Sequence, residues 1–247
     1  MNPRSRILGA DVDAITETEV VSLVDEALAG GRKLRLGVVN AAKLVKMVSD
    51  EQLRKDVVSS DLVLADGMSV VWASRILGSA LPERVAGIDL MFRFFELADR
   101  RGYSVFCLGA TEEISETIER NLARDYPNLR LAGRRNGYFD EFEENAVAMA
   151  IRDSQPDILL VAMTSPKKEN FMGRWDELMS VPVVHGVGGS FDVYAGKVER
   201  APDAWQRLGL EWLYRVKQEP GRLWKRYART NLTFIWMILL QRLGRRY

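Results

Sequence analysis

Short apolar runs alternate along the chain with longer amphipathic stretches. Six of these runs are rich in Val, Leu or Ile, and most end at or just before a Gly, Asn or Asp: Leu34–Asn40, Asp61–Ala65, Ser104–Gly109, Leu129–Gly133, Asp157–Met163 and Val181–Val187. Continuous apolar runs of this length, bounded by turn residues, are typical of strands that are buried on both faces of a sheet. The pattern therefore predicts six strands.

The stretches between these runs have helical length. Five are predicted as helices: Ala41–Val58, Asp89–Arg101, Thr111–Tyr126, Glu141–Asp153 and Pro166–Met179. Thr111 is a candidate N-cap, and Ser165 is a candidate cap that precedes a proline at the first helical position. Strands that alternate with helices build parallel sheets. We therefore predict an α/β fold, a Rossmann-like mostly parallel sheet with helices on both faces, whose chemistry lies at the carboxyl ends of the strands.

The composition changes after Gly196. Residues 201–247 read as two or three helices rich in Trp, Leu and Arg, and no low-complexity linker precedes them. A chain of 247 residues, 47% of them hydrophobic, can bury one core and a smaller attached unit. We predict an α/β domain over residues 1–196 and a helical C-terminal appendage over residues 197–247.

The net charge of +1 conceals an asymmetry. Residues 205–247 contain ten Lys or Arg and two Glu, a local balance of +8, so the first 204 residues carry −7. The appendage also holds the largely apolar run 232–240, flanked by arginines. A basic, Trp-rich segment around an apolar run is typical of a helix that lies on an anionic membrane surface. The alternative is a helix packed on the domain or in an oligomer interface, and the apolar character disfavours nucleic acid.

The compartment is predicted from what the sequence lacks. Cys107 is the one cysteine, and it falls in an apolar run, which indicates a buried small side chain rather than a disulfide. The first residues contain no apolar signal-peptide core, and no run reaches the roughly 20 apolar residues that span a bilayer. We expect a cytoplasmic protein, attached peripherally to the inner face of the cell membrane.

Three polar residues in the first part of the chain could carry chemistry. Asp66 follows a strand and could act as a general base, although a helix cap is an equal alternative. Asn40 ends the preceding strand and can both donate and accept hydrogen bonds. Arg84 lies in a loop shaped by proline and glycine and suits a phosphate, or else forms a salt bridge within that loop.

Two further segments suggest an anion site. Thr164, Lys167 and Lys168 lie where a strand turns into a helix, whose free N–H groups attract anions. The sequence G-V-G-G-S-F-D contains Gly188, Gly189 and Asp192, and its glycines would let the backbone approach a ligand closely. A solvated lysine pair and a tight structural turn are the plain alternatives.

Metal and cofactor sites have little support in the sequence. His185 is the one histidine, and the single D-x-D, at Asp11 and Asp13, lies before the first predicted strand. Neither zinc nor a dedicated magnesium site is indicated. The early G-x-G-x-x-G of dinucleotide enzymes is absent, which argues against an epimerase or dehydrogenase. We expect no cofactor.

Seven strings, in one order over about residues 34–230, resemble the WecG/TagA/CpsF glycosyltransferases: NAAKLV, ADGMSVVWASRILG, LPERVAGIDL, NGYFDE, TSPKKE, GVGGSFDVYAGKVERAP and LGLEWLYRVKQEPGRLWKRY. The resemblance implies inverting transfer of a sugar, typically N-acetylmannosamine, from a UDP-sugar to a polyprenyl-diphosphate-linked sugar acceptor. Relatives build surface polymers and exopolysaccharides.

The resemblance also implies roles for individual residues. Asp66 matches the proposed general base, and Asn40 and Arg84 match residues that hold the sugar and the diphosphate. Gly188 and Gly189 match the turn beside the nucleotide, while Gly109 and Tyr138 lie in motifs expected on the uridine side. Arginines of the appendage could stabilise the departing UDP, the candidates being Arg215, Arg222 and Arg226 together with Lys225. A scaffold that keeps the fold without catalysis is the alternative.

Two positions depart from the family pattern. Val38 stands where members commonly have threonine, and Lys168 stands where they commonly have glutamine. A hydroxyl and an amide are thereby replaced by a methyl and an ammonium group. We hypothesise that the donor sugar differs from N-acetylmannosamine, with Lys168 facing the diphosphate or a carboxylate such as that of a uronic acid.

Overall fold

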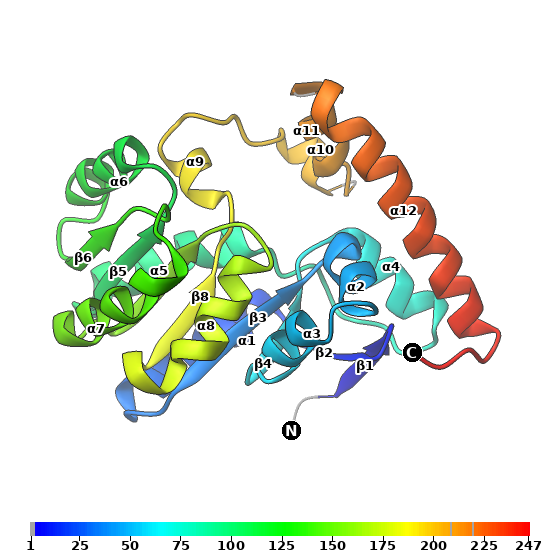
Figure 1. Ribbon diagram of the computed structural model, residues 1–247, viewed down its shortest axis with the longest axis horizontal. Coiled ribbons are helices and arrows are strands. Elements are labelled where there is room, and N and C mark those ends of the chain that lie inside the picture. The colour runs from blue at the N-terminus through cyan, green and yellow to red at the C-terminus, as the bar shows by residue number, and fades with distance from the viewer. Residues whose placement is uncertain (1–2, 208, 219) are drawn as a thin grey trace.

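The computed structural model of the protein describes residues 3–207, 209–218 and 220–247, and it describes Asp203, Arg207, Arg215, Arg222, Leu223 and Arg226 by their backbone alone. At the centre of this part lies a six-stranded sheet (Figure 1). Its strands are β3 (Leu34–Val39), β4 (Leu62–Ala65), β5 (Ser104–Gly109), β6 (Arg130–Arg135), β7 (Ile158–Ala162) and β8 (Val183–Gly186). They pair in parallel in the order β4-β3-β8-β7-β5-β6. The predicted parallel sheet and its six strands are confirmed.

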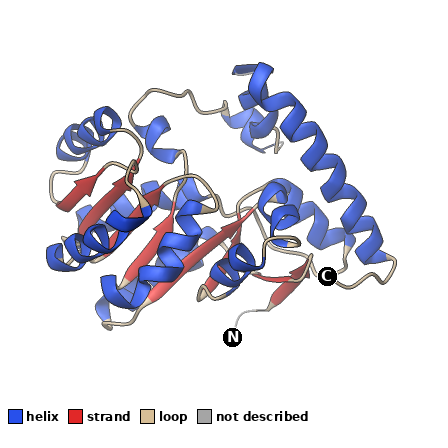
Figure 2. Cartoon of the chain, viewed as in Figure 1, coloured by secondary structure: helices blue, strands red, loops and turns tan. Residues whose placement is uncertain are grey.

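Helices cover both faces of this sheet (Figure 2). One face packs against α1 (Glu17–Ala29), α5 (Gly87–Arg101), α6 (Glu112–Asp125) and α9 (Ser190–Tyr194). The other packs against α2 (Ala41–Met47), α3 (Glu51–Val58), α7 (Glu144–Ser154), which follows the 3₁₀ turn η1 (Glu141–Glu143), and α8 (Lys167–Met179). Within β7, Ile158 and Leu160 face the first core while Leu159 and Val161 face the second, as the two-residue period of a strand requires.

All five stretches predicted as helices are helical, but one of them is divided and one predicted cap is absent. The stretch predicted as one helix over Ala41–Val58 is two, because Asp50 caps a new helix by accepting a hydrogen bond from the Leu53 N–H. Thr111 is the N-cap of α6, as predicted. The cap predicted at Ser165 is wrong, since α8 begins at Lys167 and its N-cap position makes no side-chain hydrogen bond. The helices α1, α4 (Met68–Ile76) and α9 were not predicted.

A short antiparallel hairpin precedes the sheet. It consists of β1 (Arg4–Ile7) and β2 (Ala10–Asp13), and sequence analysis missed it. The buried carboxylate of Asp13 accepts hydrogen bonds from Arg4 at 2.8 Å and from the Val63 N–H of β4 at 2.8 Å. The D-x-D motif therefore fastens the hairpin to the sheet.

Cys107 lies in β5 at the centre of the sheet and is buried. Burial raises the pKa of its thiol to about 12, because the surroundings disfavour the thiolate. The prediction that it serves as a small apolar side chain is confirmed.

The C-terminal part of the chain forms α10 (Asp203–Arg207), α11 (Glu211–Gln218) and α12 (Pro220–Arg242). Helix α12 runs along the side of the domain that carries α2 and α4, and the chain ends beside the hairpin (Figure 1). Phe234 and Ile238 are buried in the core of that side, and the Gln241 side chain bonds the hairpin backbone at Leu8 and Arg6. Among the helices of the described part, none is long and apolar enough to cross a membrane.

Candidate active site

A large cavity opens at the carboxyl ends of the parallel strands. Its volume is about 1660 Å³. Five strands each contribute the residue that follows their last one, namely Asn40, Asp66, Ala110, Met163 and Val187. Open α/β sheets bind their ligands at this edge. The sequence-based expectation for the location of the chemistry therefore coincides with a cavity.

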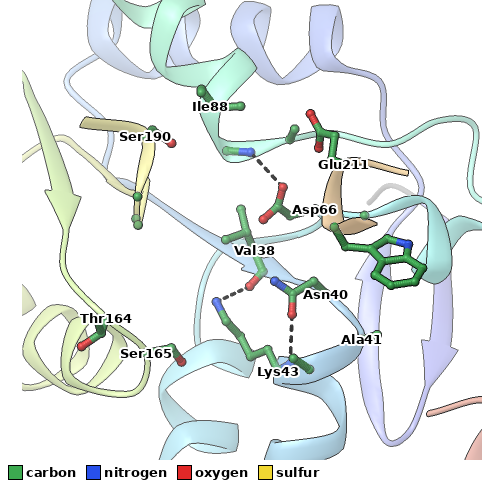
Figure 3. A pocket seen from close by; sticks show the side chains of 18 of the residues that line it. Val38, Asn40, Ala41, Lys43, Asp66, Ile88, Thr164, Ser165, Ser190 and Glu211 are labelled. Atoms are coloured by element: carbon green, nitrogen blue, oxygen red, sulfur yellow. Dashed lines mark hydrogen bonds between the residues drawn. The ribbon is translucent and has the colours of Figure 1, made fainter. Parts of the chain in front are cut away.

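Asp66 lines this cavity. Its Oδ1 accepts a hydrogen bond from the Gly87 N–H, the first residue of α5, at 3.3 Å (Figure 3). Burial raises the pKa of the Asp66 carboxyl above its usual value, and the opposing effects of Lys43, Gly87, Arg84 and Lys168 do not cancel the rise. A carboxylate with a raised pKa is a better proton acceptor than an exposed one. The site thus contains a group suited to general-base catalysis.

Asn40 lies beside Asp66 because their strands are neighbours. In the parallel pair β3–β4, Val39 is opposite Ala65, so the next residues, Asn40 and Asp66, leave the sheet side by side (Figure 3). The Asn40 Oδ1 caps α2 by accepting a hydrogen bond from the Lys43 N–H at 3.0 Å. Capping fixes the side chain and leaves the amide Nδ2 to donate a hydrogen bond into the cavity.

A buried cluster of charges supports the floor of the cavity. The Lys43 Nζ donates to the Val38 carbonyl at 2.6 Å and to the Glu169 Oε1 at 2.7 Å. Burial opposes the charge of Glu169, but Lys43 and Lys168 outweigh it and lower the pKa of Glu169 to about 2. Two ammonium groups, those of Lys43 and Lys168, therefore share one buried carboxylate. The negative charge of Asp66 also favours the charged form of Lys168.

Lys168 has a partner within the protein. Its Nζ lies 3.5 Å from the Glu169 Oε1, and its methylene groups pass so close to Gly186 that a Cβ there would lie 2.8 Å from them. Burial and the neighbouring charge of Lys43 lower the pKa of Lys168 to about 8. The side chain lines the cavity, although its contact with Glu169 already compensates part of its charge. A substrate carboxylate is not needed to explain a lysine here.

Arg84 belongs to a ring of four charged side chains at the cavity wall. It contacts Asp89 of α5 at 3.2 Å and Glu211 of α11 at 2.5 Å. Arg200 contacts the same two carboxylates, Asp89 at 2.5 Å and Glu211 at 3.9 Å. The predicted loop salt bridge with Asp89 exists, and Glu211 extends it into the appendage. The ring therefore attaches α11 to the domain through Arg84, the proposed phosphate-binding arginine.

Lys167 holds the loop that carries Tyr138. Its Nζ donates hydrogen bonds to the carbonyls of Gly137 at 3.2 Å and Phe139 at 2.7 Å, and it lies 4.3 Å from the centre of the Phe139 ring. Tyr138 projects at the rim of the cavity and is 77% exposed. Thr164 also lines the cavity from an exposed position. Lys167 thus positions a rim loop.

The glycine-rich turn after β8 forms another wall. Gly188 has φ +56°, a conformation that favours glycine, and Gly188, Gly189 and Asp192 all line the cavity. Gly109 lies behind the lining, since a Cβ there would be 2.3 Å from the Ala162 carbonyl oxygen. Its role in the structure is the close approach of β5 to β7, and its neighbour Ala110 lines the cavity instead.

Three predicted residues of the appendage are placed only by their backbone. Arg215 lies in α11, and Arg222 and Arg226 lie in α12, but their side chains are outside the described part of the structure.

Among the described residues, no group of three or more His, Cys, Asp or Glu could hold a metal ion. His185 is buried beneath the site, where burial lowers its pKa to about 4 and its Nε2 lies 3.2 Å from the Gly87 carbonyl oxygen.

Sequence analysis missed four charged residues around the site. Lys43 and Glu169 form its buried ion pair, and Arg200 and Glu211 complete its ring of charges. The sequence did contain a signal for Lys43. It lies three residues after the cap residue Asn40, and residues three apart are neighbours on the surface of a helix. No local pattern connects Glu211 with Arg84, which are 127 residues apart in the sequence.

Comparison with known proteins identifies the class to which this fold and cavity belong. The pattern of the family described as "Glycosyl transferase WecG/TagA/CpsF family" matches residues 5–247. The chain therefore belongs to this family of glycosyltransferases, and the resemblance predicted from its motifs is confirmed.

Individual relatives agree with the family. A protein of Bacillus spizizenii is 41% identical over 169 residues, which cover 68% of this chain and 64% of that protein, just under two thirds of its length. A protein of Bacillus subtilis is 34% identical over 191 residues, 77% of this chain and 73% of that protein. One from Staphylococcus aureus strain MW2 is 32% identical over 242 residues, which cover 97% of this chain and 93% of that protein. All three are named N-acetylglucosaminyldiphosphoundecaprenol N-acetyl-beta-D-mannosaminyltransferase.

Proposed function

We propose that the protein is an inverting glycosyltransferase that moves a sugar from a UDP-sugar to a polyprenyl-diphosphate-linked sugar acceptor in the synthesis of a surface polymer or exopolysaccharide. The observation that carries the proposal is the pair Asn40 and Asp66, side by side at the carboxyl ends of β3 and β4 in a large cavity. The names of the relatives support this choice of acceptor.

Asp66 is the general base of the proposed reaction. Its Oδ1 is held by the Gly87 N–H, and its Oδ2 takes the proton of the acceptor hydroxyl. The acceptor oxygen then forms a bond to the anomeric carbon while the bond from that carbon to the UDP oxygen breaks, and UDP leaves with the bonding electrons. A single displacement of this kind inverts the anomeric centre. The raised pKa of Asp66 favours the proton transfer.

The other cavity residues bind the two substrates. Asn40 donates its amide hydrogen to a sugar hydroxyl, and Arg84 binds diphosphate oxygens. On the nucleotide side we place Tyr138, Thr164, Lys167, Gly188, Gly189 and Asp192, with Gly109 supporting that wall. Lys168 lines the same cavity and acts on the diphosphate through its charge.

The donor is N-acetylmannosamine or a related hexose or uronic acid, carried by UDP. The relatives' names favour the first. Val38 and Lys168 are the two positions that could change the choice of donor sugar. Both line the cavity, where Val38 lacks a hydroxyl and Lys168 carries an ammonium group. Incubation with UDP-N-acetylmannosamine, UDP-glucose and UDP-glucuronate, with prenyl-diphosphate-linked N-acetylglucosamine or glucose as acceptor, tests the proposal by the mass of the product. The absence of any transfer would refute it.

Residues 197–247 form an appendage that docks the enzyme on the inner face of the cell membrane. Exposed apolar side chains recur along one face of α12 at Leu232, Ile235, Trp236 and Leu239, and the exposed Leu243 directly follows the helix. Exposed arginines follow at the end of the chain. Each basic residue near an anionic leaflet contributes on the order of 1 kcal/mol. Flotation with anionic vesicles should be lost when residues 197–247 are removed, and unchanged flotation would contradict the docking role.

The appendage has a second proposed task at the active site. Arg215, Arg222 and Arg226 are candidates to stabilise the departing UDP as negative charge develops on it. Glu211, which contacts Arg84, brings α11 to the cavity wall. Each arginine is replaced by alanine in turn, and at least one of the three variants should turn over a soluble acceptor analogue more slowly. Full turnover in all three variants would remove this role.

A further inference from the structure

The cavity extends beyond the polar residues into an apolar groove. Met68, Trp72 and Ile76 of α4 line one side, and Leu232, Ile235 and Leu239 of α12 line the other. We call this part the α4–α12 groove. Residues four apart lie on one face of a helix, so the α4 residues form a line along the helix. Most of these side chains are partly or largely exposed although they are apolar, and such a surface marks a binding site.

The inner end of the groove adjoins the catalytic groups. Met68 is two residues from Asp66, and the line from Met68 to Ile76 runs outward for about 12 Å at the helical rise. Gly209 of the appendage crosses this inner end, where a Cβ would lie 2.5 Å from the Met68 side chain and 3.3 Å from the Trp72 ring. The groove is thus covered beside the site and leads away from it along the two helices.

The cavity is too large for one substrate. Sites for small ligands typically measure about 300–1000 Å³. The 1660 Å³ found here leaves room for an acceptor beside a sugar nucleotide. The charged side chains among the described lining residues lie on elements other than α4 and α12, and most of the lining on these two helices is apolar, so the volume along them suits an apolar group.

We infer that the α4–α12 groove binds the first prenyl units of the lipid acceptor and guides the chain into the bilayer. This inference rests on the proposed function. A prenyl diphosphate is charged at one end and apolar along the rest. Arg84 and the catalytic pair lie at the inner end of the groove, and exposed apolar side chains of α4 and α12 line the rest of it. The order of charged and apolar surfaces in the protein matches the order of groups in that ligand.

Two adjacent residues separate binding in the groove from docking on the membrane. Ile235 is 55% exposed and lines the cavity, whereas Trp236 is 62% exposed and lies outside it. A change to glutamine at either position leaves the buried residues of α12 in place. The variant Ile235→Gln should impair recognition of the chain, and Trp236→Gln should impair only attachment to vesicles. Ile76→Gln provides the same test from the α4 side.

The experiment measures KM in the full-length protein for N-acetylglucosaminyl diphosphates that carry a methyl, geranyl or undecaprenyl group, in detergent. In the wild type, the geranyl acceptor should bind at least about tenfold better than the methyl one, because burial of its apolar surface is favourable. Ile235→Gln and Ile76→Gln should lose most of that gain while the KM values for the methyl acceptor and the donor stay unchanged. Trp236→Gln should keep the gain and weaken vesicle flotation.

Equal chain-length gains in the wild type and both groove variants would overturn the inference. Failure of the wild type to transfer sugar to any acceptor would instead contradict the proposed function. A second measurement reads the groove without catalysis: a prenyl diphosphate with a benzophenone on its second prenyl unit should crosslink to peptides of α4 and α12. Crosslinks confined to other peptides, or to Trp236 and Leu243, would overturn the groove assignment.

Discussion

Glu169→Gln tests the buried charge cluster beneath the site. Glu169 is 6% exposed and its Oε1 accepts a hydrogen bond from the Lys43 Nζ at 2.7 Å. Its pKa is lowered from 4.5 to about 2, and at 1.36 kcal/mol per unit this corresponds to about 3 kcal/mol in favour of the ionised form. Removal of one partner of a buried pair costs about 3–5 kcal/mol. We expect a loss of unfolding free energy of about 3 kcal/mol.

Urea unfolding at neutral pH measures this loss from the midpoint and the slope. The matched control is Glu119→Gln, which breaks the contact of an exposed carboxylate with Arg134, and its cost should be about 0–1 kcal/mol. Because the folded-state pKa of Glu169 lies below the unfolded value of 4.5, its stabilisation is present above that pH and is lost as the pH falls towards 2. The variant should therefore lose less stability than the wild type between these values. Equal losses for the two variants at neutral pH would refute the reasoning.

Three other changes have definite expected outcomes. Arg84→Lys keeps the charge but not the planar fork, so transfer should fall roughly 10- to 100-fold in a steady-state assay, and an unchanged rate would contradict diphosphate binding. Gly109→Ala should lower the unfolding free energy by roughly 2–4 kcal/mol, since its Cβ would meet the Ala162 carbonyl, whereas Gly78→Ala, with open space, should cost about 1 kcal/mol; similar costs would contradict the close approach. Lys167→Ala frees the rim loop, so the donor KM should rise several-fold with kcat little changed, and a fall in kcat alone would argue against this role.

The strands and the place of the chemistry could be predicted from the sequence because both depend on local patterns. Most strands of the six-stranded sheet are apolar runs, and Asn40 and Asp66 directly follow two of them. Helix α4 was missed because the run after Gly67 is apolar and partly β-branched, a composition that short windows do not assign to a helix. The hairpin was missed because its strands, R-S-R-I and A-D-V-D, contain charged residues and are not apolar runs.

Long-range pairing is the part that local patterns do not contain. Lys43 and Glu169 are 126 residues apart in the sequence, and the sheet order β4-β3-β8-β7 brings their helices to the same face. The same holds for Glu211 and Arg84, which meet because α11 lies over the cavity. The groove likewise forms only where α4 and α12 lie in contact. The apolar run of α12, taken alone, predicts only a helix that lies on a membrane surface.

Asp66→Asn is the most direct test of the proposed catalysis. The amide keeps the shape of the side chain and the contact of its oxygen with the Gly87 N–H, but it cannot accept the acceptor's proton. Transfer should fall about 10²- to 10⁴-fold, with the urea midpoint and donor binding retained. In the wild type, kcat should fall as the pH drops through the raised pKa of Asp66. Activity of Asp66→Asn within about tenfold of the wild type, with the same pH dependence, would contradict a general-base role for Asp66.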